Sequence, residues 1–249
     1  GIIAQPDWHN VESLKVMGKP RFGVLVSAGN LDSMINHYTA AKKPRRQDAY
    51  SPGGQSGLRP DYAAAVYSRL AKQAFPDTPV ILGGVEASMR RFAHYDYWSD
   101  SVKPSWLVEG GADLLVYGMA ELTLQEVAAI LAGGGTVADW RQVPGLAYLL
   151  PLGSPLPQRR ALEIPSLKQV RSSKRAFAKA FQQIDREQNF YDGKILLQRH
   201  NEVYLVVNPP QRPLTTPEMD EIYELPFTNS WHSSYDALGG VPALAEVEF

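Results

Sequence analysis

The sequence has 249 residues, of which 44% are hydrophobic, and a formal net charge of −1. This composition predicts a folded core and excludes an intrinsically disordered chain, while the near-zero charge argues against a surface that is basic throughout and binds nucleic acid or anionic membrane by charge alone. The sequence contains no cysteine, which excludes disulfides, thiolate metal sites and iron–sulfur ligation by its own residues. It also has no apolar run long enough to cross a bilayer and no secretory signal, so we expect a cytoplasmic protein.

The first half of the sequence alternates predicted strands with predicted helices. Continuous apolar runs predict strands at 22–27, 79–84 and 113–117, and we expect the first of them to be buried on both faces. Helices are expected from Pro60 and over 121–131. This spacing is typical of parallel βαβ units and predicts the α/β class, with a Rossmann-like, doubly wound parallel sheet.

The second half has a different pattern. The Pro/Gly-rich stretch 144–157 reads as a linker with one short strand at 146–150. We further predict a helix over 166–188 with Ala176, Phe177, Ala180, Phe181 and Ile184 on one face, a hairpin of 194–198 with 203–207, and a short helix capped by Thr216.

These patterns predict three parts: a Rossmann-like domain over 1–150, a connecting α+β segment over 151–225, and a further piece over 226–249. Residues 1–4 read as the tail of a strand and residues 246–249 as the start of another. Because a strand needs a neighbour or a cover, we expect further sequence on both sides.

Ligands of doubly wound sheets bind beyond the carboxyl ends of the strands. The segments 27–33, 83–98 and 117–121 fall there, and their glycines allow a flat ligand or a phosphate to approach the backbone. The alternative, that these glycines only form tight turns, stays open. No catalytic residue or metal ligand is predicted, and the candidate ligand-binding or cavity-lining residues are Asn30, Gly83, Gly84, Glu86, Arg90, Arg91, His94, Tyr95, Tyr97, Gly118 and Glu121.

Several shorter patterns have two readings each. The cationic and aromatic residues 90–98 suit stacking on a planar ligand, or a helix with Met89 and Phe92 facing the core. The glycine-rich loop 53–57 lacks the ending of a P-loop. The basic run 42–46 is interpreted as a solvated loop, with a phosphate or RNA contact as the alternative.

Asp7-Trp8-His9 matches the beginning of the D-x-H-x-x-G signature, whose histidine ligates the cobalt of cobalamin. Glu12 stands where that signature has glycine, so cobalt ligation by His9 is not expected.

Taken in order, several segments resemble the N-terminal region of the YgiQ-type radical SAM family. The resemblance covers essentially the whole chain, and its long block at 81–100 is the most specific part. The segments are SAGNLDSMINHYTAAKKPRRQDAYSPGG (27–54), RPD (59–61), ILGGVEASMRRFAHYDYWSD (81–100), GADLLVYGMAE (111–121), NPP (208–210), ELPF (224–227) and GGVPALAEVEF (239–249).

The resemblance implies a cobalamin-binding-like Rossmann domain ahead of a radical SAM barrel that would begin within 226–249. A Cys-x3-Cys-x2-Cys motif beyond Phe249 would hold a [4Fe–4S] cluster, and S-adenosylmethionine would be cleaved to a 5′-deoxyadenosyl radical. This chain would cover the barrel, its expected partner, and shape the substrate cavity. No cofactor is expected in the chain itself, cobalamin included, and no membrane partner.

The sequence departs from the family at two places. Asn229 and Ser233 replace an arginine and a proline in a loop expected at the barrel mouth, and Ala120 replaces a glycine. The resemblance therefore implies a reaction class and no substrate. A corrinoid-binding or RNA-binding module is the alternative interpretation.

Overall fold

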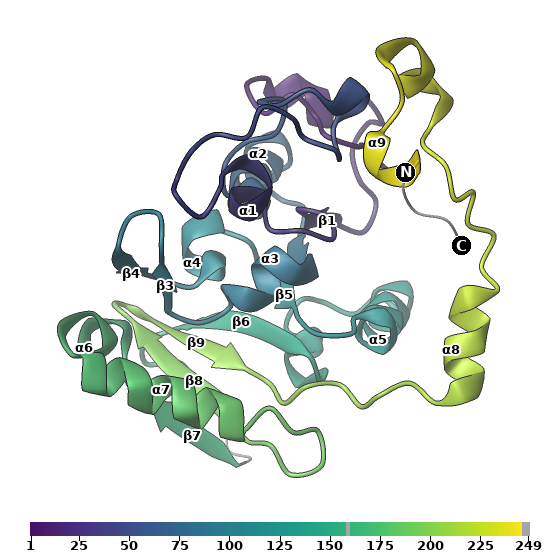
Figure 1. The fold of residues 1–249 in the computed structure, drawn as a ribbon. Coiled ribbons are helices and arrows are strands. Elements are labelled where there is room, and N and C mark those ends of the chain that lie inside the picture. Colours follow the sequence, from purple (N-terminus) through teal and green to yellow (C-terminus); the bar gives the residue numbers. More distant parts are fainter. Residues whose placement is uncertain (158–159, 246–249) are drawn as a thin grey trace.

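The structure, a computed structural model, describes residues 1–157 and 160–245. Its centre is a seven-stranded sheet with the spatial order β1-β2-β5-β6-β9-β8-β7 (Figure 1). The strands are β1 (Val24–Ser27), β2 (Val80–Gly83), β5 (Leu114–Val116), β6 (Leu146–Pro151), β7 (Ala161–Ile164), β8 (Ile195–His200) and β9 (Val203–Val207). A separate hairpin consists of β3 (His94–Asp96) and β4 (Ser101–Lys103).

The half of the sheet that comes from the start of the chain is parallel. β1 pairs with β2, and β2 with β5, all in the same direction. The chain passes between them through α2 (Ala63–Ala74), and through α3 (Gly84–Met89) and α4 (Trp106–Gly110). The apolar runs of β2 and β5 therefore form buried parallel strands as expected, and the α/β class is confirmed.

The other half of the sheet is mostly antiparallel. β6 runs antiparallel to β5 and β9, β8 runs antiparallel to β9, and only β7 lies parallel to its neighbour β8. The short strand predicted at 146–150 is confirmed as β6, but the interpretation of 144–157 as a linker is wrong, because β6 lies in the middle of the sheet. The apolar side chains of β6 pack into the cores on both faces of the sheet. The boundary expected at residue 150 falls inside β6, and β7, β8 and β9 extend the same sheet.

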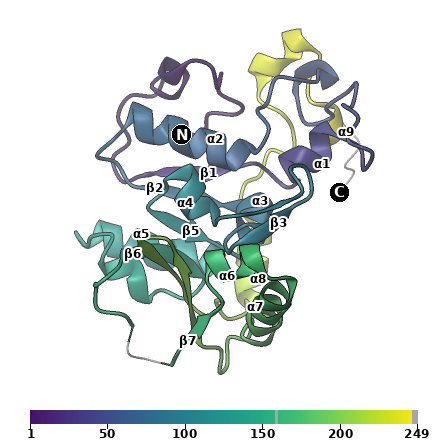
Figure 2. The ribbon, with the colours of Figure 1, turned by 90° about the vertical axis from the view of Figure 1, so that its left-hand side faces the viewer.

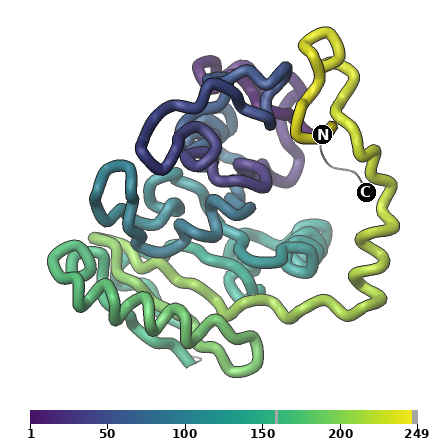
Figure 3. The backbone as a smooth tube through the Cα atoms, viewed as in Figure 1, coloured from purple at the N-terminus to yellow at the C-terminus, as the bar shows by residue number. Residues whose placement is uncertain are grey.

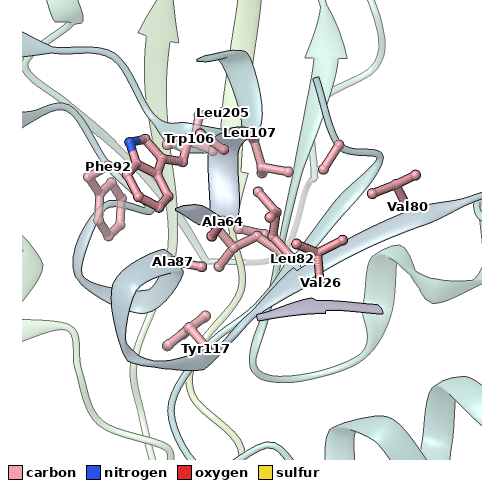
Figure 4. Packing of buried hydrophobic residues seen from close by; sticks show 14 of the residues in the cluster. Val26, Ala64, Val80, Leu82, Ala87, Phe92, Trp106, Leu107, Tyr117 and Leu205 are labelled. Carbon is pink, nitrogen blue, oxygen red and sulfur yellow. The ribbon is translucent and has the colours of Figure 1, made fainter. Parts of the chain in front are cut away.

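Two hydrophobic cores lie on opposite faces of this sheet. The larger one joins α2 and α4 to the strands and includes Val26, Leu82 and Trp106 (Figure 4). The smaller one lies under α5 (Glu121–Ala132) and η3 (Asp139–Gln142) and includes Trp140. α6 (Leu167–Ser172) and α7 (Lys174–Arg186) add to the larger core near β7 and β8 (Figure 2).

Three predictions about the first sixty residues are wrong. β1 is an edge strand, so one of its faces packs on α2 while Leu25 on the other face is 62% exposed. The helix expected from Pro60 begins at Ala63, because Tyr62 adopts a left-handed conformation with φ of 53°. Residues 1–4 form no strand. The remaining early elements are η1 (Val11–Leu14), α1 (Ser33–His37) and η2 (Pro52–Gly54).

The helix predicted over 166–188 is two helices. Ser173 lies in extended conformation between α6 and α7, and its side chain accepts from Ala176 N to cap α7. Of the predicted apolar face, Ala180 is buried while Phe181 is exposed. The predicted hairpin is confirmed as β8 and β9, and α8 (Thr216–Tyr223) is confirmed with Thr215, one residue earlier than expected, as its cap.

After β9 the chain leaves the sheet as a long outer segment (Figure 3). We call residues 209–245 the C-terminal strap; it contains α8, η4 (Ser233–Leu238) and α9 (Pro242–Ala245). It is held at one end by Asn208, whose side chain donates to the carbonyls of Arg141 and Val143. At the other end Gly53 N donates to Gly240 O. The strand expected at 246–249 lies outside the described residues.

Candidate functional site

The carboxyl ends of β1, β2 and β5 are neighbours, so the three glycine-containing turns meet at one edge of the sheet. Gly84 has φ of +82°, and a Cβ built there would lie 2.5 Å from Ser27 Oγ of the adjacent turn. Gly118 has φ of +73° with open space around it. The first glycine is therefore required by close approach of two turns, and the second by its backbone conformation alone.

Beneath this edge Glu86 joins two helices. The side chain is fully buried, and its carboxylate accepts from Ser33 N at 2.5 Å and from Ala64 N at 3.1 Å, in the first turns of α1 and α2. Burial raises the pKa of Glu86, against the effect of these hydrogen bonds. Because both oxygens are engaged, this side chain stabilises the turns at the edge.

The side chains of the two arginines that follow α3 also contact other residues of this chain. Arg90 donates to the buried Asp32, and its guanidinium lies 4.7 Å from the centre of the Trp106 ring. Arg91 lies 4.5 Å from the centre of the Tyr117 ring and donates to a carbonyl at 2.6 Å. Burial lowers the pKa of Arg91.

The aromatic segment after these arginines is a hairpin and not a helix. α3 ends at Met89, which is exposed, and Phe92 is buried, so the helical alternative with both side chains in the core is wrong. His94 is part-buried with its Nδ1 3.1 Å from Phe92 O, and burial lowers the pKa of His94 to about 4. Tyr95 and Tyr97 are exposed on the hairpin.

The structure thus separates the predicted site residues into groups. Asn30 and Gly118 are exposed at the turns, beside Gly83 and Gly84, and Glu121 opens α5 three residues after Gly118. The Glu121 Oε2 atom is buried and has no hydrogen-bond partner within the described part of the chain. Other predicted residues lie under this edge or on the hairpin: Glu86, Arg90, Arg91, His94, Tyr95 and Tyr97.

Large apolar side chains surround the glycine turns and face solvent. We call this set the apolar edge. Its members are Leu25 on β1, Ile35 on α1, Val85 and Met89 on α3, and Met119 after β5.

A second candidate site, which sequence reasoning missed, is a cavity of about 190 Å³ between α1 and the loops that follow it. His37 Nδ1 lies 2.8 Å from Asp61 Oδ1, and the Tyr38 hydroxyl donates to Asp61 Oδ2 at 2.7 Å. The Asp61 carboxylate raises the pKa of Tyr38. The buried pair of Arg59 with Asp48, at 2.8 Å, lines the same cavity.

The His37 ring is suited to accept a proton or to bind a ligand at one atom. With Nδ1–H donating to Asp61, Nε2 carries the lone pair, and Nε2 is buried without a partner among the residues that the structure describes. The only sequence signal was indirect: His37 and Asp61 lie in two of the segments that carry the family resemblance, 24 positions apart.

Comparison with known proteins decides the family. Residues 1–249 match the family described as Radical SAM N-terminal. The chain belongs to the radical SAM N-terminal family. It is 50% identical over 249 residues to a UPF0313 protein of Clostridium botulinum (strain 657), of which the match covers 39%. It is 45% identical over 249 residues to a UPF0313 protein of Clostridium perfringens (strain 13), of which the match covers 38%. No solved structure matches the chain.

This radical SAM N-terminal domain spans about two fifths of the length of the curated relatives it matches. The family name implies a [4Fe–4S] cluster, but the chain offers no thiolate, and its described residues bring together no group of three metal-ligating side chains. The residues present do not fit the cluster. His9 does not lie in the glycine turns: it precedes β1, is exposed, and its ring lies 3.6 Å from that of Trp8.

In the described part of the chain, no helix combines the length and the apolar character that crossing a membrane requires.

Proposed function

We propose that this domain is the accessory, non-catalytic part of a radical SAM enzyme, and that it covers the catalytic part and closes one side of the substrate cavity. The cluster and S-adenosylmethionine would be held by other residues of the complete protein. Family membership supports the reaction class, and the greater length of the relatives leaves room for a catalytic domain. The single observation that carries the docking role is the exposed apolar edge.

The apolar edge collects exposed apolar side chains from neighbouring elements. Leu25, Met89 and Met119 are each more than 60% exposed, and they follow or belong to neighbouring elements of the sheet edge. Exposed apolar side chains that gather in one region of a folded surface usually mark a contact with another surface. Asn30 and Glu121 lie in the same turns, and we place them at the border of the cavity.

The C-terminal strap offers a second apolar surface. α8 has no buried residue, yet its N-terminus is closed by a capping box between Thr215 and Glu218, and Arg212 pairs with Glu218 at 2.5 Å. Tyr223, Leu225 and Phe227 at its end are all more than half exposed. A well-capped helix without a packed face is typical of a segment that contacts a partner. The strap arches outside the side of the sheet on which α3 and α5 lie (Figure 1).

The experiment uses the complete protein, reconstituted anaerobically with iron and sulfide and then reduced with dithionite in the presence of S-adenosylmethionine. We expect about four irons per chain and formation of 5′-deoxyadenosine. A protein that binds no iron–sulfur cluster and forms no 5′-deoxyadenosine would overturn the reaction class.

The docking role is tested separately in the same protein. Met89→Glu with Met119→Glu places charge in the apolar edge, and we expect faster hydrogen exchange of the strap and of the catalytic part with little change inside β2 and β5. Val16→Glu, at an exposed apolar residue before β1, is the matched control. Equal exchange in both variants would contradict docking at this edge while leaving the reaction class intact.

A further inference from the structure

Three segments that are distant in the sequence lie side by side on the face of the molecule that carries β3 and β4 (Figure 2). The loop after α1 is tied to the hairpin, since Lys42 Nζ donates to Trp98 O at 2.8 Å and the Tyr97 hydroxyl donates to Ala40 O at 2.6 Å. On its other side the hairpin is tied to α6, where Arg171 Nε donates to Val102 O at 2.9 Å. We call the surface of these segments the basic face.

The basic face collects positive charge from a chain that is almost neutral as a whole. Within residues 38–46, 94–105 and 165–186, the acidic residues are Asp100, Asp185 and the buried Asp96, and the basic residues are Lys42, Lys43, Arg45, Arg46, Lys103, Lys168, Arg171, Lys174, Arg175, Lys179 and Arg186. Among the described residues, none of these basic side chains forms an ion pair with a carboxylate. All except Lys103 are exposed. Charges left unneutralised on one face are available to an anionic partner.

The break between α6 and α7 gives this face a groove of about 350 Å³. Gln169, Ser172 and Ser173 line it together with the cations Arg175 and Lys179. Cations beside hydroxyl and amide groups are the usual protein partners of backbone phosphates in nucleic acids.

Two exposed tyrosines lie on the hairpin between the basic segments. The Tyr95 hydroxyl donates to Asp100 Oδ1 at 2.7 Å, and Tyr97 is fixed through Ala40 O, so both rings are restrained although both residues are about half exposed. Lys42 Nζ lies 4.9 Å from the centre of the Tyr97 ring, which brings a cation to this platform. Restrained aromatic rings within a basic groove serve as stacking platforms for unpaired bases. Stacking on exposed rings is a property of unpaired bases, so the combination of these rings with the surrounding cations favours a single-stranded nucleic acid.

We propose that the basic face binds a single-stranded nucleic acid, with the phosphates along the loop 42–46, the hairpin and the α6–α7 groove, and with bases stacked on Tyr95 and Tyr97. The net charge of the chain predicts weak non-specific binding by its other surfaces, so the site is local. This site borders the apolar edge at Arg45, whose Nε donates to Ile35 O at 3.2 Å, but it shares no residue with that edge and does not depend on the proposed docking role.

The test is fluorescence anisotropy of labelled RNA and DNA of the same sequence, about 15 nucleotides long and unpaired, titrated with the complete protein. Lys168→Glu with Arg175→Glu reverses one charge on α6 and one on α7. Lys19→Glu with Arg21→Glu reverses charge on exposed residues before β1 and is the matched control. Tyr95→Leu with Tyr97→Leu removes the platforms and leaves the charge, and circular dichroism verifies folding of every variant.

We expect the charge-reversed variant to bind at least about tenfold more weakly at low salt, with a shallower dependence of log K on log salt, since each lost phosphate contact lowers the slope by about 0.7. The tyrosine variant should bind more weakly with an unchanged salt slope, and the control should bind like the parent. Tighter binding of RNA than of DNA would indicate further contacts between the protein and the 2′-hydroxyl groups.

Three outcomes would overturn the proposal. One is the absence of binding to either oligonucleotide at low salt. Another is equal weakening by the α6–α7 variant and by the control, which would show a diffuse charge effect. The third is binding to phosphatidylserine vesicles that is as strong as binding to the oligonucleotides and is insensitive to the tyrosine variant, which would assign the face to a membrane surface.

Discussion

Arg90, the first residue after α3, donates a hydrogen bond to Asp32, the residue that caps α1. The Asp32 carboxylate is almost fully buried, and it also accepts from Met34 N at 2.9 Å and Ile35 N at 3.3 Å. The turn after β1 and the helix after β2 are therefore joined by one buried ion pair. Its loss would leave a charged carboxylate unpaired beneath the candidate site.

Arg90→Ala should lower the free energy of unfolding by about 3 kcal/mol, because an uncompensated buried charge remains on Asp32. Urea unfolding followed by circular dichroism measures this. Arg175→Ala, which removes an exposed and unpaired arginine, should change stability by less than about 0.5 kcal/mol. Equal stability of the Arg90 variant and the parent would show that the pair contributes nothing to the fold.

Gly84→Ala and Gly118→Ala should lower the free energy of unfolding by different amounts, although both glycines have positive φ. The Gly118 variant meets open space and should lose about 1 kcal/mol to backbone strain. The Gly84 variant should lose more, about 3 kcal/mol, because its methyl group meets Ser27 Oγ. That hydroxyl accepts from Gly29 N at 3.0 Å, so rotating it away loses a hydrogen bond.

The decisive control for this pair is a second substitution at the neighbouring turn. Adding Ser27→Ala should restore part of the stability of the Gly84 variant and none of the Gly118 variant, as measured by thermal unfolding. If Ser27→Ala helps neither, the close approach of the two turns is not the cause.

The stability of the domain should fall as the pH falls from 6.5 to 4. Burial lowers the pKa of His94 and of His200 to about 4, and both imidazoles are neutral in the folded chain. The unfolded chain binds these protons near its ordinary pKa of 6.5, so acid favours unfolding by roughly 3 kcal/mol per histidine once the pH reaches 4. Well above pH 6.5 both histidines are neutral in the folded and in the unfolded chain, so their contribution to the free energy of unfolding no longer changes with pH.

Urea unfolding at pH 7 and pH 5 checks this dependence. His94→Gln should reduce the difference in the free energy of unfolding between pH 7 and pH 5. His232→Gln, at an exposed histidine, should leave this difference unchanged. An identical pH dependence in the parent and the His94 variant would contradict a neutral, buried His94.

Hydroxocobalamin added to the complete protein should show no change in its visible spectrum. His9 precedes β1 and packs on Trp8. His94, the histidine of the segment 83–98, is part-buried on the hairpin with its Nδ1 3.1 Å from Phe92 O. His9→Ala is the control if a change does appear. A spectral shift that disappears in this variant would establish cobalt ligation and favour the corrinoid-binding alternative.

The parallel part of the fold could be predicted because its strands are continuous apolar runs separated by helices. β2 and β5 occur where the pattern placed them, as does α5. The strand at 146–150 was predicted, but the prolines and glycines around it resemble a linker, and only the pairing of β6 with β5 and β9 shows that it is central. The exposure of Leu25 likewise depends on which strand lies at the edge, and no local pattern reveals this.

The candidate site was predictable in outline and not in its contacts. The rule that ligands bind beyond parallel strands brought the three glycine turns together correctly. It could not show that Glu86 and Arg90 are engaged with α1 and Asp32, since these contacts cross more than fifty positions of sequence. The His37–Asp61 contact was missed because 24 positions separate the two residues and no local pattern connects them.

The strap described above has a topological consequence. It is fixed to the domain at Asn208 and again at Gly240, so the chain between these points closes a ring. A body that is already folded and wider than the ring cannot pass through it. Near the second point Ala243 N also donates to Ala49 O at 2.8 Å, so two backbone hydrogen bonds close the ring there. A body inside the ring would therefore either fold in place or enter while both of these bonds are open.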